Sequence, residues 1–176
     1  AGNAAGPNTA TDWQSTNYDN TANRYSPLTQ ITADNVTQLQ QAWSFHLKPA
    51  GYTGRPREDE AIPLVVGHTM YLASPYGAIH ALDATTGSEK WKFTLPNNDL
   101  PAKRGLAYWP GDGTLPPSLI FGGLAGGLYS VKAADGTLNA GFGAAGIVNL
   151  KTPEVMQTGM NQAYSLLSAP TIYKNL

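Results

Sequence analysis

The sequence predicts an all-β fold and, more narrowly, part of a β-propeller. Charged residues make up 13% of the 176 residues and aromatic residues 10%, and this charged share is about half of that usual for a soluble domain. The 19 glycines and 13 prolines indicate many tight turns. A strand-and-turn unit also recurs along the chain. Together these observations favour short antiparallel strands over helices.

The N-terminal part predicts little regular structure. Residues 1–11 are small and polar, so we expect a disordered lead-in before a domain that covers 12–176. One short helix is expected within 31–39, because Thr32 is a suitable N-cap and an acidic residue follows near the positive helix end. A strand should then cover 41–45.

Short strands separated by glycine turns are expected from residue 60 onward. Their predicted ranges are 63–66, 69–73, 78–82 and 91–93. Gly67, Gly77 and Gly87 lie between consecutive strands, where a backbone with positive φ is easiest for glycine. This pattern predicts an antiparallel meander of four strands.

The same unit occurs twice at a constant spacing. Four positions of the first unit reappear about 49 residues later with the same or a similar residue: Gly77 and Gly126, Ile79 and Leu128, Leu82 and Val131, Gly87 and Gly136. The Trp-x-Phe segments at 43–45 and 91–93 have a similar spacing. Repeats of this length with about four strands each are typical of propellers. Two unrelated hairpins in a β-sandwich are the less favoured alternative.

The length of the chain limits how much of a propeller it can contain. A blade needs about 40 to 50 residues, and rings have about four to eight blades. The sequence therefore holds two full units and parts of two others. The last residues, 172–176, look like a strand, a turn and the start of another strand. We expect missing blades, or self-association, to cover the open edges.

Composition excludes several classes of function. The net charge of −1 leaves no basic patch for nucleic acid, and no apolar run is long enough to span a membrane. The absence of cysteine removes disulfides, thiolate catalysis and Cys-based zinc sites. His46, His68 and His80 show no metal-ligand spacing.

Several stretches resemble the pyrroloquinoline-quinone (PQQ)-dependent dehydrogenases. Residues 81–91 (ALDATTGSEKW) resemble the tryptophan-docking repeat of that family, and 104–113 (RGLAYWPGDG) resemble the segment that brings an arginine to the cofactor. Residues 12–13 with 23–28 resemble its opening segment, and 60–66 resemble its first-blade strand. The segment 104–113 is similar to the alcohol dehydrogenase branch, whereas 142–150 is closer to the membrane glucose dehydrogenase branch.

The resemblance implies an eight-bladed periplasmic propeller, of which this chain is the N-terminal portion. It implies oxidation of an aldose or an alcohol, with hydride transfer to PQQ and onward electron transfer to a quinone or cytochrome. The parent protein could be attached to the inner membrane. The calcium ligands and the catalytic aspartate of the family come from later blades. We therefore expect Ca²⁺ to be held by residues outside this chain, no catalytic residue within it, and no activity of the chain alone.

Three residues match cofactor-binding positions of the family. Arg104 matches an arginine whose planar fork suits the PQQ carboxylates. Glu60 matches a glutamate that contacts the cofactor, although it also ends a polar run typical of solvated charge. Ser168 stands beside Leu167, where a threonine is common, and an ordinary strand hydroxyl is an equal alternative for it.

Two departures from the family pattern bear on the branch. Many alcohol-oxidising members carry adjacent cysteines before the arginine, whereas here Pro101-Ala102-Lys103 occupies that region. Trp109 stands where the glucose dehydrogenase branch can have a histidine. A non-catalytic propeller scaffold and an inert or self-associating fragment remain as alternative functions.

Overall fold

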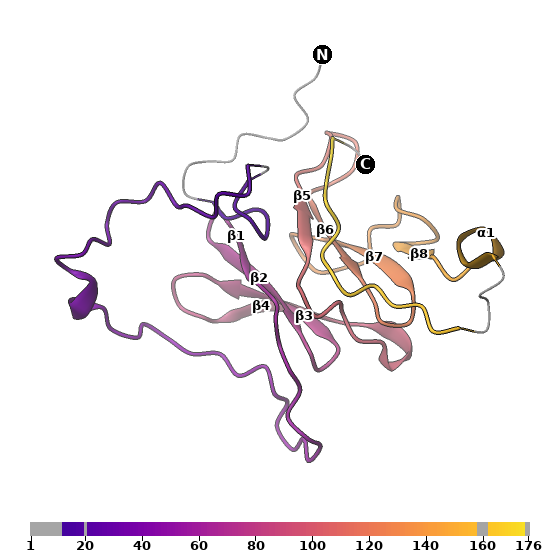
Figure 1. Cartoon of the computed structure of the whole chain (residues 1–176), viewed down its shortest axis with the longest axis horizontal. Coiled ribbons are helices and arrows are strands. Elements are labelled where there is room, and N and C mark those ends of the chain that lie inside the picture. Colours follow the sequence, from indigo (N-terminus) through magenta and orange to yellow (C-terminus); the bar gives the residue numbers. More distant parts are fainter. Residues whose placement is uncertain (1–11, 20, 158–161, 175–176) are drawn as a thin grey trace.

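The computed structural model describes residues 12–19, 21–157 and 162–174, so the expected lead-in 1–11 lies outside the described residues. These residues form two four-stranded antiparallel sheets, each an uninterrupted meander (Figure 1). No strand is exchanged between the sheets. Two consecutive meanders of this kind are blades of a β-propeller rather than the halves of a Greek-key sandwich. No helix in the described ranges is long and apolar enough to cross a membrane.

The first blade contains the strands that the glycine turns predict. They are β1 (Leu64–Val66), β2 (Thr69–Ser74), β3 (Ala78–Asp83) and β4 (Glu89–Thr94), paired in that order. Gly67, Gly77 and Gly87 have φ of 57°, 89° and 73° in the three connections. The positive φ explains why glycine occupies each turn.

The second blade repeats this arrangement and confirms the internal repeat. It contains β5 (Ala107–Trp109), β6 (Ser118–Gly122), β7 (Gly127–Lys132) and β8 (Ile147–Asn149). The equivalent turns again use glycines with positive φ, 89° at Gly126 and 71° at Gly136. The fourth strand is shorter than β4 and pairs with β7 over three residues.

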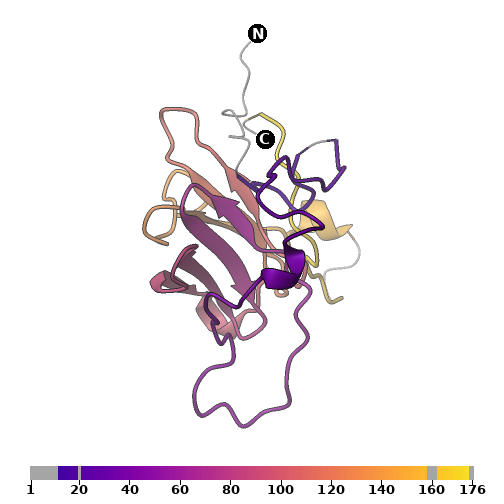
Figure 2. The ribbon, with the colours of Figure 1, turned by 90° about the vertical axis from the view of Figure 1, so that its left-hand side faces the viewer.

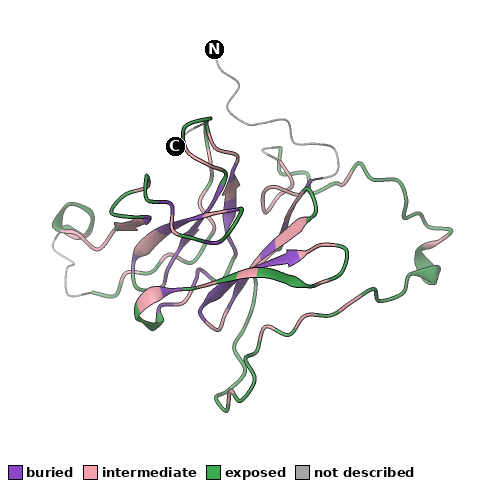
Figure 3. Ribbon diagram, turned by 180° about the vertical axis from the view of Figure 1, so that it is seen from behind, coloured by how far each residue is buried: buried purple, intermediate pink, exposed green. Residues whose placement is uncertain are grey.

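One hydrophobic core lies between the two blades (Figure 3). Alternate residues of each sheet face it, as the two-residue period of a strand requires. Its members include Leu64, Tyr71 and Ile79 from the first sheet and Leu119, Phe121 and Val131 from the second. Tyr71 also donates a hydrogen bond from its hydroxyl to the carbonyl of Ala133 at 3.1 Å, which joins β2 to the neighbouring blade.

Trp91 of β4 docks on the second blade, as expected for the tryptophan of the repeat. Its Nε1 donates to the carbonyl of Ala133 at 3.1 Å. A Cβ added to Gly136 would lie 2.5 Å from the indole ring. The ring therefore lies against bare glycine backbone, and the turn after β7 must stay free of a side chain.

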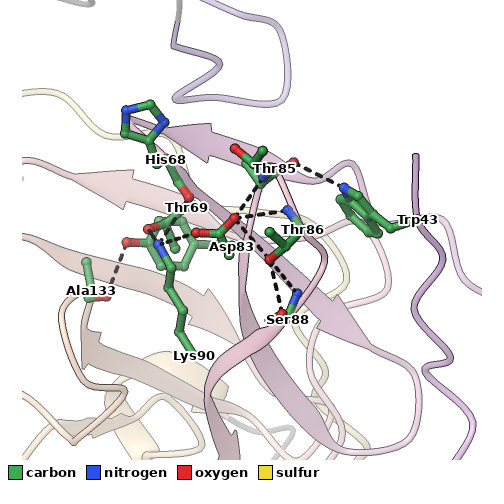
Figure 4. Close-up of polar contacts among 11 residues, drawn as sticks. Trp43, His68, Thr69, Asp83, Thr85, Thr86, Ser88, Lys90 and Ala133 are labelled. Atoms are coloured by element: carbon green, nitrogen blue, oxygen red, sulfur yellow. Dashed lines mark hydrogen bonds and ion pairs between the residues drawn. The ribbon is translucent and has the colours of Figure 1, made fainter. Parts of the chain in front are cut away.

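The expected strand at 41–45 is not formed, and this prediction was wrong. No strand of the described chain pairs with this segment through its backbone, and a strand without a partner leaves its backbone hydrogen bonds unmade. Trp43 nevertheless docks on the first blade. Its Nε1 donates to the carbonyl of Ala84 at 3.2 Å (Figure 4), and its ring covers Gly87.

The helix expected within 31–39 is a single 3-10 turn, η1 (Val36–Gln38). Asn35, and not Thr32, is its N-cap residue, and its side chain does not cap the turn but accepts the N–H of Thr32 at 2.8 Å. The turn lies on a long excursion, 21–60, that leaves the sheets and is largely exposed (Figures 1, 2 and 3).

Two other short helical segments were not expected, η2 (Pro96–Asn98) and α1 (Pro153–Met156). The expected strands near the C-terminal end are also absent from the described residues, since 162–174 have no strand structure. This segment crosses the second blade through single hydrogen bonds and not through a ladder. Residues 175 and 176 of the predicted last strand lie outside the described part.

Candidate functional site

The two charged residues singled out in the sequence meet at one edge of the blades. Glu60 precedes β1 and Arg104 precedes β5, and β1 and β5 are the first strands of their blades. The segments that enter the first strands of neighbouring blades share one face of a propeller, because each blade repeats the same direction of its strands. Residues 44 positions apart are brought together in this way.

Arg104 and Glu60 form an exposed ion pair. The Nε of Arg104 donates to Oε2 of Glu60 at 3.2 Å, with 63% and 50% of the two side chains exposed. Such a pair stabilises a fold by no more than about 1 kcal/mol. Within the described residues, the Nη groups of Arg104 donate to no protein acceptor, so they are available to an anion.

A second ion pair lies beside the first. Lys103 Nζ contacts Glu58 Oε2 at 3.3 Å. The segment 58–60 and the loop 103–104 are thus joined by two neighbouring charge pairs. Lys103 and Glu58 also line a pocket of about 310 Å³ together with Arg57, Leu100 and Leu124. Sequence reasoning did not single out Lys103 or Glu58, because isolated charges in a polar run carry no distinguishing pattern.

Ser168 lies close to this edge, because the residue before it, Leu167, is hydrogen-bonded to Arg104. The backbone N–H of Arg104 donates to the carbonyl of Leu167 at 3.2 Å. The segment containing Ser168 therefore touches the loop 103–104, which is called the arginine loop below. Ser168 is exposed, and its hydroxyl has no hydrogen bond to the described protein. By contrast, Ser165 Oγ donates to the carbonyl of Leu124 at 2.8 Å, which is a structural contact.

The three histidines lie apart from this edge. His46 and His68 are exposed, whereas His80 is buried on β3 with its Nδ1 2.6 Å from Glu89 Oε1. Burial lowers the pKa of His80, although the hydrogen bond that His80 makes to the Glu89 carboxylate acts in the opposite direction. No cluster of three or more acidic, histidine or cysteine residues that could hold a metal occurs in the described ranges.

The chemistry of the edge suits a planar anion that carries several carboxylates. Arg104 offers N–H donors arranged as a fork, the Ser168 hydroxyl can donate or accept, and Glu60 can accept from a ring N–H or hydroxyl. The exposed charges and the unused donors fit PQQ, whose carboxylates need cations and whose ring edge needs hydrogen-bond partners. These residues could hold one edge of that group.

Fold and site together define this chain as part of a β-propeller with two ion pairs at the edge where its first strands begin. The model of the family described as glucose/ethanol/alcohol dehydrogenase, beta-propeller domain, matches residues 13–176. The chain belongs to this family of PQQ-dependent dehydrogenases.

Curated relatives come from both branches of the family. The quinoprotein glucose dehydrogenase of Escherichia coli is 31% identical over 80% of the chain and 20% of its own length. The quinohemoprotein alcohol dehydrogenase of Pseudomonas putida is 35% identical over 71% of the chain and 17% of its own length. A solved structure of this Pseudomonas enzyme matches with a TM-score of 0.71 and 29% identity over 93% of the chain, or 22% of that structure. The chain thus spans about a fifth of the length of these relatives.

Proposed function

We propose that this chain forms the N-terminal blades of a periplasmic PQQ-dependent dehydrogenase that oxidises an aldose or an alcohol. The observation that carries the proposal is the pairing of Arg104 with Glu60 at the edge where the first strands of both blades begin. No catalytic residue is proposed within the chain.

The roles proposed for the three residues follow from their surroundings. The free Nη donors of Arg104 take a carboxylate of the cofactor, and Glu60 keeps the guanidinium oriented through its Nε. Ser168 donates its hydroxyl from the segment that crosses the arginine loop. When bound, PQQ supplies the two-electron acceptor for oxidation of the substrate. The chain itself binds and orients one side of that group.

The names of relatives support the proposed partners. One relative from Thauera butanivorans is a 1-butanol dehydrogenase (cytochrome c), and one from Gluconobacter oxydans is an alcohol dehydrogenase (quinone) subunit. A cytochrome or quinone acceptor is proposed for this protein on that basis. A europium-containing methanol dehydrogenase also matches, with a TM-score of 0.57 and 33% identity. A metal, Ca²⁺ in our proposal, would be held by residues outside this chain.

A non-catalytic propeller scaffold is the second candidate, since the docked tryptophans serve any propeller. A scaffold has no need for an arginine with unused donors beside a glutamate at the start of the first strands. The convergence of Arg104, Glu60 and the Ser168 segment therefore favours the cofactor-binding function.

The test uses the complete gene product, titrated with PQQ by fluorescence quenching and assayed with an artificial dye on glucose and ethanol, with and without Ca²⁺. We expect saturable PQQ binding and PQQ-dependent turnover of one substrate, with binding weakened about 10-fold or more in Arg104→Ala, as expected when a charged hydrogen bond is lost. Arg24→Ala is the matched control, because its Nε also donates to a single side chain, Asn17, at 2.8 Å. A protein that binds no PQQ and oxidises neither substrate would favour the scaffold.

A further inference from the structure

A buried carboxylate near the arginine loop has no role in the site described above. Asp99 lies between η2 and β5 and is only 7% exposed. Its Oδ1 accepts the N–H groups of Leu100 and Ala125, at 2.8 and 2.9 Å. Its Oδ2 accepts the hydroxyl of Tyr129 at 2.9 Å. A buried charge is retained only where it is so fully bonded.

The second blade is shaped around this carboxylate. A Cβ on Gly123 would lie 2.1 Å from Asp99 Oδ2 and 2.8 Å from the Tyr129 ring. Tyr129 is itself buried and stacked on Phe121 with ring centroids 5.4 Å apart. Burial, reinforced by the hydrogen bond to Asp99, raises the pKa of Tyr129 to about 12. The hydroxyl therefore remains a donor to the carboxylate at every physiological pH.

The Asp99 contacts join the turn between β6 and β7 to the loop that carries the arginine. Beside the carboxylate, Leu124 N–H donates to the Leu100 carbonyl at 2.9 Å, and Ala102 N–H donates to the Gly122 carbonyl at 2.7 Å. Arg104 follows two residues after Ala102. The course of the backbone up to Arg104 is thus determined by its attachment to this turn.

The same turn also holds the segment that contains Ser168. Leu166 N–H donates to the Gly123 carbonyl at 3.2 Å, and Ser165 donates to the Leu124 carbonyl at 2.8 Å. A Cβ on Gly122 would lie 2.2 Å from Leu166. The turn therefore holds both the arginine loop and the segment with Ser168 at the edge where Arg104 meets Glu60.

We propose that Asp99 is the positioning residue of the PQQ site: with Tyr129 it fixes the β6–β7 turn to the arginine loop and so places the Arg104 guanidinium. This inference rests on the proposed function. Asp99 does not touch the cofactor and acts mainly through Arg104, because its own contacts hold the loop that carries the arginine. Loss of its contacts frees the loop, and the guanidinium then must be ordered when PQQ binds, which weakens binding.

The test is a double-mutant cycle in the complete gene product, with PQQ affinity as the readout. Asp99→Ala should weaken PQQ binding about 10-fold, and in the Arg104→Ala background it should have almost no further effect, as expected for residues that act through one another. Asp99→Asn should bind PQQ within about threefold of the parent, since its Oδ1 still accepts both N–H groups and its Nδ2 can donate to the Tyr129 hydroxyl.

A second readout needs no cofactor. Trypsin cleaves after Lys103 and Arg104, and Asp99→Ala should accelerate cleavage at these bonds several-fold, because a freed loop enters the protease more easily. Cleavage after Arg24, on the exposed excursion, should be unchanged. If Asp99→Ala does not fold, Tyr129→Phe replaces it in both experiments and should act in the same direction with a smaller effect.

The outcomes separate this inference from the proposed function. Equal losses of affinity on removing Asp99 in the parent and in Arg104→Ala, or unchanged cleavage after Lys103 and Arg104, would overturn the positioning role. A parent that binds no PQQ contradicts the proposed function, whereas a protein that binds PQQ through Arg104 without coupling to Asp99 contradicts only the present inference.

Discussion

Trp43 and Trp91 make the same two contacts, each with the blade that follows it. Each indole donates to a backbone carbonyl, 41 and 42 residues further along the chain respectively. Each ring also lies where the Cβ of a turn glycine would otherwise be, at Gly87 and at Gly136. The repeat is therefore a repeat of contacts between blades, and it holds even though Trp43 is not part of a strand.

The docking contact predicts a large cost for a side chain at Gly136. Gly136→Ala places a methyl group 2.5 Å from the Trp91 ring at a φ of 71°. Overpacking and a left-handed backbone should together lower the free energy of unfolding by about 2–4 kcal/mol. Urea unfolding followed by tryptophan fluorescence measures this change.

Gly67→Ala is the matched control for Gly136→Ala. Gly67 has a φ of 57°, and a Cβ there meets nothing within 4 Å. Only the backbone cost of about 1–2 kcal/mol should appear. Equal losses of stability in the two variants would show that the indole contact does not constrain this turn.

The hydrogen bond from Tyr71 to the second blade predicts a moderate loss of stability when its hydroxyl is removed. Tyr71→Phe removes the donor to the Ala133 carbonyl but leaves the Trp91 Nε1 on the same oxygen. The carbonyl thus stays bonded, and the free energy of unfolding should fall by about 1 kcal/mol. Tyr25→Phe, at a residue that is 73% exposed, should change little. A loss at Tyr25 as large as that at Tyr71 would contradict this assignment.

The buried His80 predicts a loss of stability in acid. Burial lowers its pKa below the ordinary value of 6.5, and Lys92 acts in the same direction, while Glu89 opposes both. Below pH 6.5 the unfolded chain binds a proton that the folded chain binds less readily. The contribution of His80 to stability is therefore complete above about pH 6.5 and is lost as the pH falls towards its folded pKa.

Urea unfolding at several pH values between neutral and mildly acidic conditions tests this expectation. His80→Gln should flatten the decline in the free energy of unfolding over this range, whereas His68→Gln, at an exposed turn, should leave the decline as it is. An unchanged slope in His80→Gln would assign the acid sensitivity to other groups.

Tyr129 should ionise well after an ordinary tyrosine. Its pKa is raised from 10.0 to about 12, first by burial and then by Asp99. The unfolded chain releases this proton earlier, so the contribution of Tyr129 to stability is complete below pH 10 and declines as the pH rises towards 12.

The measurement is tyrosinate absorbance after a rapid pH jump, before the protein unfolds, as the difference between the parent and Tyr129→Phe. The difference should titrate near pH 12, and it should move to lower pH in Asp99→Asn, because the negative charge that opposes ionisation is gone. A difference that titrates near pH 10 in the parent would contradict the buried hydrogen bond.

Local patterns in the sequence were sufficient for the four strands of the first blade and, through the repeat, for the existence of a second one. Glycines at turn positions and alternating apolar residues predict β1 to β4 closely, because a hairpin is determined by residues adjacent in the chain. The strand expected at 41–45 has the same local pattern, yet it is not formed, because a strand also requires a partner that local pattern does not reveal. Glu60 and Arg104 were identified by resemblance to a family and not by any local signal.

The sequence by itself determined the blade repeat and its glycine turns, and its resemblance to a family pointed to Glu60 and Arg104. Only the tertiary structure decided which of these residues meet: that Arg104 pairs with Glu60, that Lys103 pairs with Glu58, and that Asp99 connects its loop to Tyr129. The physical reason is the distance along the chain. Contacts between residues about 30 to 45 positions apart depend on how two blades pack, and that packing is a property of the whole core and not of any segment.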